Sequence, residues 1–568
     1  MVTNQIKKII QVGLLVSLCL ALVACGGGGG GGTPSASSNG GGTASPKDSQ
    51  ATTGSTGGVT VSNVYSQPKE LGVGDLLYVD FNKDSSLDFS GTQSNAEYTF
   101  IVANTSANAG NLSVQLSGDL SEANLVAKDL GGEVEEDESL QIEGSPDLTE
   151  NFHAFLRVQE EALENLEVPS ESFSVSKAAS TVSPAVSVGE KKTFKVLSAL
   201  SSSTSSVDVE AAAECVGNNV VFYVDTRVTQ DMLSDADVSS LCSQFDSTIV
   251  KEQALFGQGS DVNQDGKVAI VFTPQVNRLG ASGGGIITGF FNATDLYPNS
   301  SSNTTSNFME ILYIMVPDPQ GLFGVQVSRD FALANLLPSV LIHEFQHAIS
   351  YNQHVFLKGG SAEQAWLNEG MSHLAEDIFG QGQENASRYS IFLRNPNSYP
   401  LVTSSSPGLA SRGAAYLFLR YLYEQSGQSS GFLQRLVQTS KVGTENVEKA
   451  FAGNDSSFDQ FGEFFLRWSI ALAMTDSGLT QDSRYTYQKR IMNSETGHYQ
   501  GVCLSCSVGD GRGTLLSGVG IKTYGGYQDA TTAQSSARFY TLSNLKDKLS
   551  FSNSSSKAEG FGVLIRKK

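Results

Sequence analysis

Residues 341–350 read LIHEFQHAIS, which places two histidines four positions apart with a glutamate directly after the first. A helix turns about 100° per residue, so His343 and His347 would project side by side. Two imidazoles in this position can bind one zinc ion. Glu344 would then lie beside the metal, where a base acting on water is needed. The alternative is a pair of buried histidines with no chemical role.

A second helix is predicted over residues 361–380, SAEQAWLNEGMSHLAEDIFG. Ser361 would be its N-cap, with Gln364 completing a capping box, and Gly380 would follow its last turn. Three polar residues share one face of this helix: Glu369, His373 and Glu376. Zinc bound by two histidines needs a third protein ligand, and any of the three could supply it. Helix geometry alone does not choose among them.

The two motifs together carry a resemblance. WLNEG at 366–370 places Glu369 22 residues after His347, which resembles the gluzincin pattern. With HEFQHAIS and WLNEGMSHLAED, the chain resembles the hyicolysin family of bacterial neutral metallopeptidases over roughly residues 190–475. The resemblance implies a zinc endopeptidase acting on proteins or peptides. It also implies an α+β, gluzincin-like catalytic domain, with the cleft between a strand-containing upper lobe and a helical lower lobe.

The resemblance further implies roles for individual residues. One catalytic zinc ion would be held by His343, His347 and Glu369. Glu344 would be the general base. His373 and Glu376 would be positioned to orient a zinc-binding imidazole through its other ring nitrogen. Candidates for stabilising the charge of the transition state are Tyr389, Arg412 and Tyr416.

Other hypotheses make different demands on these residues. A metzincin needs glycine and histidine at 350 and 353, where this chain has Ser350 and Gln353, and His354 comes one residue too late. A surface binding protein or adhesin on a degenerate metallopeptidase scaffold is the main alternative, although such a scaffold has no need of Glu344. A third hypothesis is a zinc hydrolase that acts on a non-peptide bond.

Composition changes along the chain divide it into six parts. These are a lipoprotein signal peptide (1–25), a Gly/Ser/Thr tether (26–58), a small β-sandwich (59–118), an acidic linker or pro-like segment (119–190), the metallopeptidase domain (191–480) and a C-terminal β-rich tail (481–568). The acidic segment contains one amphipathic helix over 151–166, in which we expect His153 to be structural. The metallopeptidase domain has strands first and helices after them.

The segment DVNQDG at 261–266 matches only the first half of a calcium-binding loop. The twelfth position of such a loop is Phe272 instead of glutamate. The sequence therefore favours an Asx-type turn that opens a strand over a calcium site.

The four cysteines that follow the signal peptide and Cys25 allow three disulfide connectivities. We expect neighbours to pair, Cys215 with Cys242 and Cys503 with Cys506. A zinc ribbon would need two matched C-x-x-C pairs, and the chain has one.

The N-terminus and the net charge predict where the chain acts. Lys7 and Lys8 precede an apolar run over 9–24, which ends in Leu-Val-Ala before Cys25. This resembles a bacterial lipobox, with Cys25 as the lipidated residue. The residue after Cys25 is glycine, so we expect a lipid anchor in the outer membrane or at the cell surface. The net charge of −21 argues against nucleic acid as a partner.

Cys25→Ser should therefore release the protein from membranes or leave an unprocessed precursor. Detergent extraction and mass spectrometry of the membrane fraction measure both. A variant that stays in the membrane with the mass of the processed wild type would contradict the lipobox.

Overall fold

The computed structural model is mixed α and β and describes residues 71–93, 95–108, 110–121, 148–163, 186–403, 408–452, 460–508, 513–555 and 558–568. The expected signal peptide, Cys25 and the tether lie outside the described residues, as does most of the acidic segment. Among the described residues, no helix has the length and apolar character that crossing a membrane requires.

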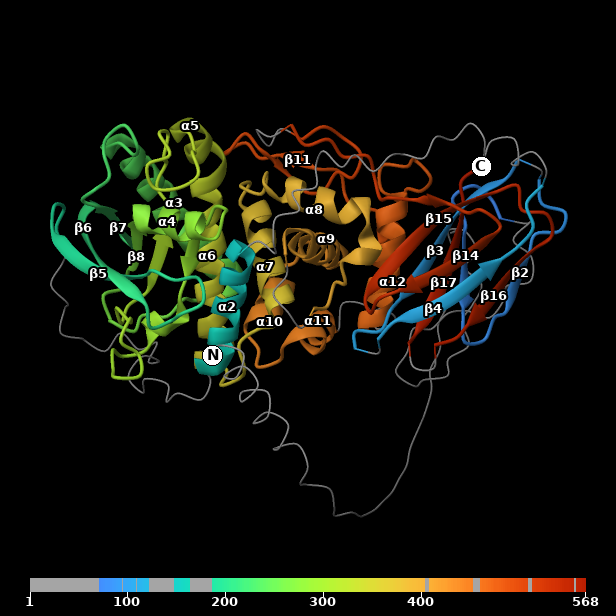
Figure 1. Cartoon of the computed structure of the whole chain (residues 1–568), viewed down its shortest axis with the longest axis horizontal. Coiled ribbons are helices and arrows are strands. Elements are labelled where there is room, and N and C mark those ends of the chain that lie inside the picture. Colours follow the sequence, from blue (N-terminus) through green and yellow to red (C-terminus); the bar gives the residue numbers. More distant parts are fainter. Residues whose placement is uncertain are drawn as a thin grey trace, which may run out of the picture. The chain divides into compact units, whose positions relative to one another are not determined.

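Strands from both ends of the chain form one pair of sheets (Figure 1). One sheet has the order β1-β17-β3-β15-β13 and the other β14-β4-β16-β2. The N-terminal strands are β1 (Leu76–Asp80), β2 (Ser86–Asp88), β3 (Glu97–Asn104) and β4 (Leu112–Ser117). The C-terminal strands are β13 (Lys522–Thr523), β14 (Tyr527–Thr532), β15 (Ser536–Ser543), β16 (Lys548–Asn553) and β17 (Gly560–Arg566).

The sequence analysis treated 59–118 and 481–568 as a separate sandwich and a separate tail, and the strand pairing corrects this. β3 lies between β15 and β17, and β4 lies between β14 and β16. Neither end alone could pair these strands or cover their apolar faces. The aromatic rings of Phe81, Phe100 and Phe551 meet between the sheets, with Phe100 and Phe551 stacked at 5.7 Å.

A six-stranded sheet, β5-β6-β7-β8-β10-β9, forms the first half of the region between these ends. Its strands are β5 (Lys191–Leu197), β6 (Ser206–Val216), β7 (Val220–Asp225), β8 (Val268–Phe272), β9 (Gly289–Phe291) and β10 (Ile311–Ile314). β7, β8 and β10 are parallel, and all five residues of β8 are buried, as expected of a strand covered on both faces. β9 runs antiparallel to β10 at the edge of the sheet.

Helices lie between these strands and make up the second half of the region. Those nearest the sheet are α3 (Asp235–Phe256), α4 (Pro274–Ser282), η5 (Ala293–Leu296), α5 (Arg329–Phe331) and α6 (Leu337–Tyr351), with π-helical turns η6 (Ala332–Leu336) and η7 (Asn352–Leu357) on either side of α6. The others are α7 (Ala365–Ile378), α8 (Asn385–Arg394), η8 (Pro396–Ser398), α9 (Leu409–Gln425), α10 (Ser430–Val437), α11 (Gly443–Phe451), α12 (Phe461–Met474) and η9 (Ser483–Tyr485). α6 contacts α3, β9 and β10 as well as α7, so it connects the sheet to the helical part.

The predicted start of α7 is wrong by one turn. The helix begins at Ala365, and neither Ser361 nor Gln364 caps it with a side-chain hydrogen bond. Instead, Glu363 accepts hydrogen bonds from Gly443 N and Asn446 Nδ2 at the start of α11, which holds residues 361–364 in a non-helical conformation. The predicted end is confirmed, because Gly380 has the positive φ of 70° that glycine tolerates.

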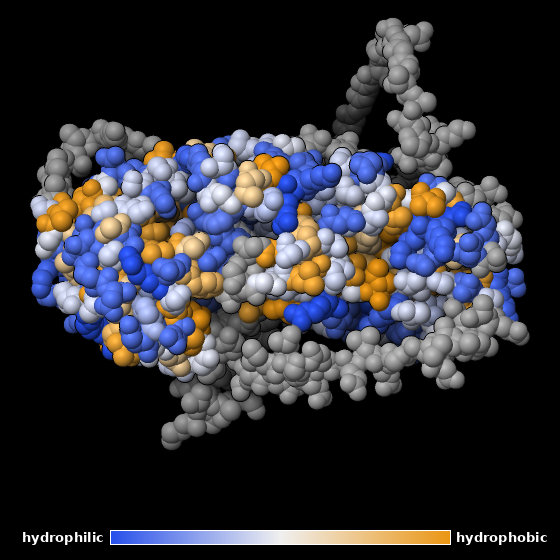
Figure 2. Space-filling view, turned by 90° about the horizontal axis from the view of Figure 1, so that it is seen from above, coloured by the Kyte–Doolittle hydropathy of each residue, from blue (hydrophilic) through white to orange (hydrophobic). Residues whose placement is uncertain are grey.

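The face in Figure 2 is mostly hydrophilic, and the cysteines pair as predicted. Hydrophilic residues predominate on the face shown in Figure 2, and hydrophobic residues there form small patches. The hairpin of β11 (Ile491–Met492) and β12 (Tyr499–Gln500) exposes about half or more of the side chains of Ile491, Met492 and Tyr499. The expected cysteine pairs lie at disulfide distance, with Cα–Cα separations of 6.5 Å for Cys215–Cys242 and 6.3 Å for Cys503–Cys506.

The turn at 261–266 is closed by its own side chains. Asp261 accepts a hydrogen bond from Gly266 N, and Asp265 accepts one from Lys267 N, as in an Asx-type turn. Glu310, just before β10, accepts a hydrogen bond from Val262 N at 2.9 Å and is 3% exposed. Burial raises the pKa of Glu310 to about 7.

Glu310 should make the protein less stable as the pH rises. A carboxyl whose pKa is raised by folding binds its proton more tightly in the native state, so its contribution is full below about pH 4.5 and is lost up to about pH 7. The loss is up to roughly 3 kcal/mol for this group. Glu310→Gln should reduce the fall in unfolding free energy between pH 5 and 7.5, measured by urea denaturation. The exposed Glu214→Gln is the control, and identical slopes in wild type and Glu310→Gln would contradict the assignment.

Candidate metal centre

The HEFQH motif lies on α6 as predicted, and α6 is buried almost along its whole length. Its apolar side faces α3, where Phe345 meets Phe245 edge to face at 6.0 Å. His343 and His347 project from the other side, with their Nε2 atoms 3.2 Å apart. The i, i+4 spacing therefore brings the two imidazoles together as the sequence indicates.

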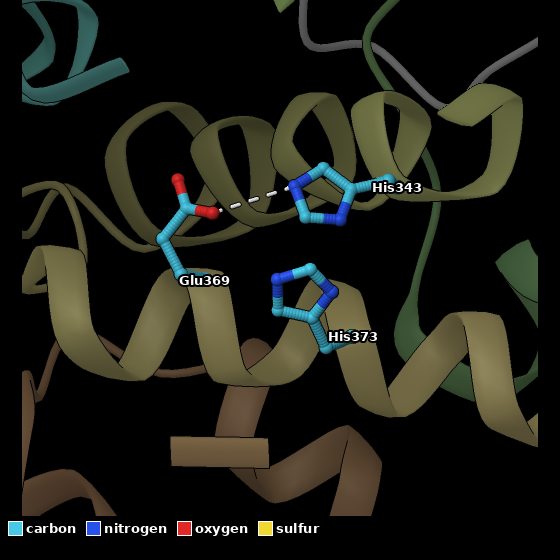
Figure 3. A group of neighbouring side chains, drawn as sticks. All are labelled: His343, Glu369 and His373. Atoms are coloured by element: carbon cyan, nitrogen blue, oxygen red, sulfur yellow. Dashed lines mark ion pairs between the residues drawn. The ribbon is translucent and has the colours of Figure 1, made fainter. Parts of the chain in front are cut away.

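α7 places Glu369 and His373 opposite His343 of α6 (Figure 3). Its close packing on α9 depends on Gly370, where a Cβ atom would lie only 3.0 Å from side-chain carbons of Ala415 and Leu419. The neighbouring Glu369 reaches both histidines of α6. Its Oε2 lies 3.4 Å from His343 Nε2, and its Oε1 lies 3.6 Å from His347 Nε2.

His373, one turn further along α7, belongs to the same cluster. His343, Glu369 and His373 are all buried, and each offers a ligand atom within 4.8 Å of the others (Figure 3). This group could hold a metal ion. Two sets of three donors are thus available. Both contain His343 and Glu369, and the third donor is either His347 or His373.

The opposite ring nitrogens are held by hydrogen bonds. Oε1 of Glu376 lies 2.7 Å from His343 Nδ1 and 3.0 Å from His373 Nδ1. Oδ1 of Asn368 lies 3.0 Å from His347 Nδ1. Since these oxygens accept, each imidazole donates from Nδ1 and directs the lone pair of Nε2 into the cluster. The sequence analysis missed Asn368, although its position directly before Glu369 on the same helix was a usable signal.

The electrostatics of the cluster favour a cation. Both oxygens of Glu369 and Nε2 of His373 are buried without a hydrogen-bond partner. Burial alone would raise the pKa of Glu369, but Arg412 and the histidines hold it well below its usual range. Burial also opposes a charge on His343, yet the carboxylates of Glu369 and Glu376 raise its pKa to about 9. A metal ion would satisfy the unpartnered atoms and supply the positive charge that these carboxylates attract.

Glu344 lies beside the cluster and next to the edge strand of the sheet. Its Oε2 accepts a hydrogen bond from Phe291 N in β9 at 2.9 Å. Burial raises its pKa, which favours the protonated form and suits a group that exchanges a proton. Glu344 also lines a small cavity together with His343, His373 and Glu376.

Of the three candidates for stabilising a transition state, the structure brings one to this cavity. Arg412 lines it, and its Nη1 lies 3.5 Å from Glu369 Oε2. Tyr389 and Tyr416 instead line a separate depression beside Asp377, and Tyr389 donates a hydrogen bond to the carbonyl of Cys503. His354 also lies apart from the cluster, 3.8 Å from Glu363.

The sequence analysis missed the contribution of α2 (Leu148–Leu163), the helix of the acidic segment. His153, expected to be structural, lines the same cavity as Glu344. Arg157 and Glu160 on α2 are buried, and the charge of Arg157 acts on both Glu344 and His347. The signal for this stripe was its spacing of i, i+4 and i+7 on a helix already recognised as amphipathic.

No protein-family model matches the chain, and no curated protein matches it.

Three alanine variants can identify which residues bind the metal. Glu369→Ala should lose Zn²⁺ in a titration against a chelator, because Glu369 contacts both histidines of α6. His373→Ala should keep the ion with an affinity roughly 10–100-fold weaker, since its loss disturbs Glu376 and His343. His498→Ala, a half-buried histidine outside the cluster, is the control. Retention of the ion by Glu369→Ala and its loss from His373→Ala would assign the site to His343, His347 and His373.

Proposed function

We propose that the chain is a zinc-dependent endopeptidase. The observation that carries the proposal is the triangle of His343 Nε2, His347 Nε2 and a Glu369 carboxylate, with separations of 3.2, 3.4 and 3.6 Å. Two ligands each about 2.1 Å from a tetrahedral ion stand about 3.4 Å apart, so this triangle fits a zinc ion. Two imidazoles and one carboxylate also form a ligand set that catalytic zinc commonly uses.

The reaction proposed is hydrolysis of a peptide bond. A bound zinc ion would supply Lewis acidity to water and to the substrate carbonyl. Glu344 takes one proton from the water as its oxygen bonds to the carbonyl carbon. The bond between that carbon and the nitrogen then breaks, and Glu344 returns the proton to the leaving amine. The hydrogen bond from Phe291 N holds one carboxylate oxygen of Glu344 throughout.

Four neighbouring residues support these steps. Glu376 and Asn368 fix the orientation of the two α6 imidazoles through Nδ1. Arg412 places a guanidinium on the wall of the cavity, where it can stabilise negative charge that develops on the substrate oxygen. In this proposal His373 acts through Glu376, because the Nδ1 atoms of His373 and His343 share Oε1 of that carboxylate.

The proposal extends to family and location. The spacing of HEFQH and WLNEG supports membership of the hyicolysin family. Cys25 supports a lipid anchor in the cell envelope, at the outer membrane or cell surface. The alternative of an adhesin on a degenerate scaffold is disfavoured, because such a protein needs neither Glu344 nor the hydrogen bonds that hold the histidines.

Glu344→Gln tests the proposal with little change in size. We expect the variant to bind about one equivalent of zinc and to lose activity by about 10³-fold, since it can no longer accept the proton. Hydrolysis of a fluorogenic peptide library, with and without a chelator, measures the activity, and elemental analysis measures the zinc.

Glu363→Gln is the matched control, because Glu363 is equally buried but contacts the start of α11, outside the cluster. Its activity should equal that of the wild type. Near-normal turnover by zinc-loaded Glu344→Gln would exclude Glu344 as the base. Chelator-resistant hydrolysis would exclude the metal mechanism.

A further inference from the structure

α2 docks beside the edge strand next to Glu344. Phe152 and Leu156, one turn apart, are 0% and 2% exposed. The ring of Phe152 meets Phe290 of β9 edge to face, with centroids 5.1 Å apart. At the end of α2, the hydroxyl of Tyr297, just after η5, donates to the carbonyl of Leu163 at 3.5 Å. These contacts hold α2 against β9 and η5.

The polar stripe of α2 faces the metal-binding cluster. It consists of His153, Arg157 and Glu160. Arg157 and Glu160 are only 4% and 2% exposed, and their side chains form an ion pair at 3.0 Å. His153 reaches the cavity lined by His343 and Glu344. A helix that served only as packing would have no reason to bury a charged stripe at this place, because burying an ion pair costs desolvation energy.

With α2 in this position the cavity beside the cluster is too small for a peptide. The cavity beside Glu344 has a volume of about 50 Å³, enough for water molecules but far below the ~300–1,000 Å³ of typical ligand sites. Glu344 is 2% exposed and His343 is 6% exposed. A substrate backbone cannot reach the base while the helix remains in place.

We propose that α2 is an autoinhibitory helix that occupies the substrate cleft beside β9, and that peptides are hydrolysed only after α2 leaves. The proposal rests on the proposed peptidase function. Among the described residues that precede the catalytic region, it assigns the inhibition to α2, because strands β1–β4 are hydrogen-bonded into the two sheets of the sandwich and cannot leave with it.

The anchoring of α2 suits a helix that can be displaced. It adds no strand to a sheet and forms no disulfide. Its apolar anchor among the described side chains is the pair Phe152 and Leu156, with Phe155 and Leu163 partly buried beside them. The buried polar groups of Arg157 and Glu160 regain water when the helix leaves, which offsets part of the lost apolar contact.

One exposed position on α2 permits a matched test. Val158 is 62% exposed, so its side chain contributes little to packing. Val158→Pro breaks the helix, at a cost of about 3 kcal/mol, without removing a core side chain. Val158→Ala keeps the helix and is the control. The second variant, Phe152→Ala combined with Leu156→Ala, removes the anchor directly.

We expect Val158→Pro and the double variant to hydrolyse the peptide library at least about 10-fold faster than the wild type. Both variants should also lose Zn²⁺ to a chelator at least about 10-fold faster than the wild type. Val158→Ala should match the wild type in both measurements. A synthetic peptide of residues 148–163 should inhibit the double variant competitively.

The two measurements separate this proposal from the proposed function. Faster zinc loss without peptide hydrolysis in any variant would support α2 as the cover and refute the peptidase. Lower hydrolysis with unchanged zinc loss would overturn the proposal and make α2 a contributor to catalysis. Unchanged hydrolysis and zinc loss in both variants would also overturn it. The same zinc-loss measurement in the Glu344→Gln background tests the cover without any chemistry.

Discussion

The carboxylate of Glu376 is the contact on which the arrangement of the centre depends. One of its oxygens is hydrogen-bonded to Nδ1 of His343 on α6 and of His373 on its own helix, α7. This fixes which ring nitrogen carries the proton, and it fixes the position of α6 along α7. Glu369 stands two helical turns before Glu376, so the same register carries it to the Nε2 atoms of His343 and His347. The close packing allowed by Gly370 supports α7 from behind.

This register has an electrostatic consequence for the interior. It brings the carboxylates of Glu344, Glu369 and Glu376 into one buried region, where ionised groups are costly unless they are paired. The guanidinium of Arg412 supplies part of the balancing charge. Both carboxylate oxygens of Glu369 lack a hydrogen-bond partner within the cluster, and a bound cation would satisfy them.

The helices could be predicted well because their information is local. Apolar residues recur at helical spacing around HEFQH and WLNEG, and α6 and α7 lie where that pattern indicates. The pairing within the sandwich could not be predicted. The alternation of apolar residues identifies a strand but not the strand it pairs with, and β3 pairs with strands more than 430 residues away. The predicted start of α7 was wrong for a similar reason, because Glu363 accepts hydrogen bonds from Gly443 and Asn446 of α11, which is distant in sequence. The position of α2 over the cluster likewise depends on Phe290, which the local pattern around Phe152 does not reveal.

The pairing of the two chain ends also determines the order of folding. Residues of β1 find their hydrogen-bond partners between Phe561 and Ile565, near the last residue of the chain. Contacts of such long sequence separation form slowly, and on a growing chain they cannot form until residues 561–565 have been synthesised. Strands β1–β4 therefore lack their native partners while the six-stranded sheet and the helices are synthesised. The part that is synthesised first among the described residues is the part that becomes native last, and its exposed strand edges are where aggregation would begin.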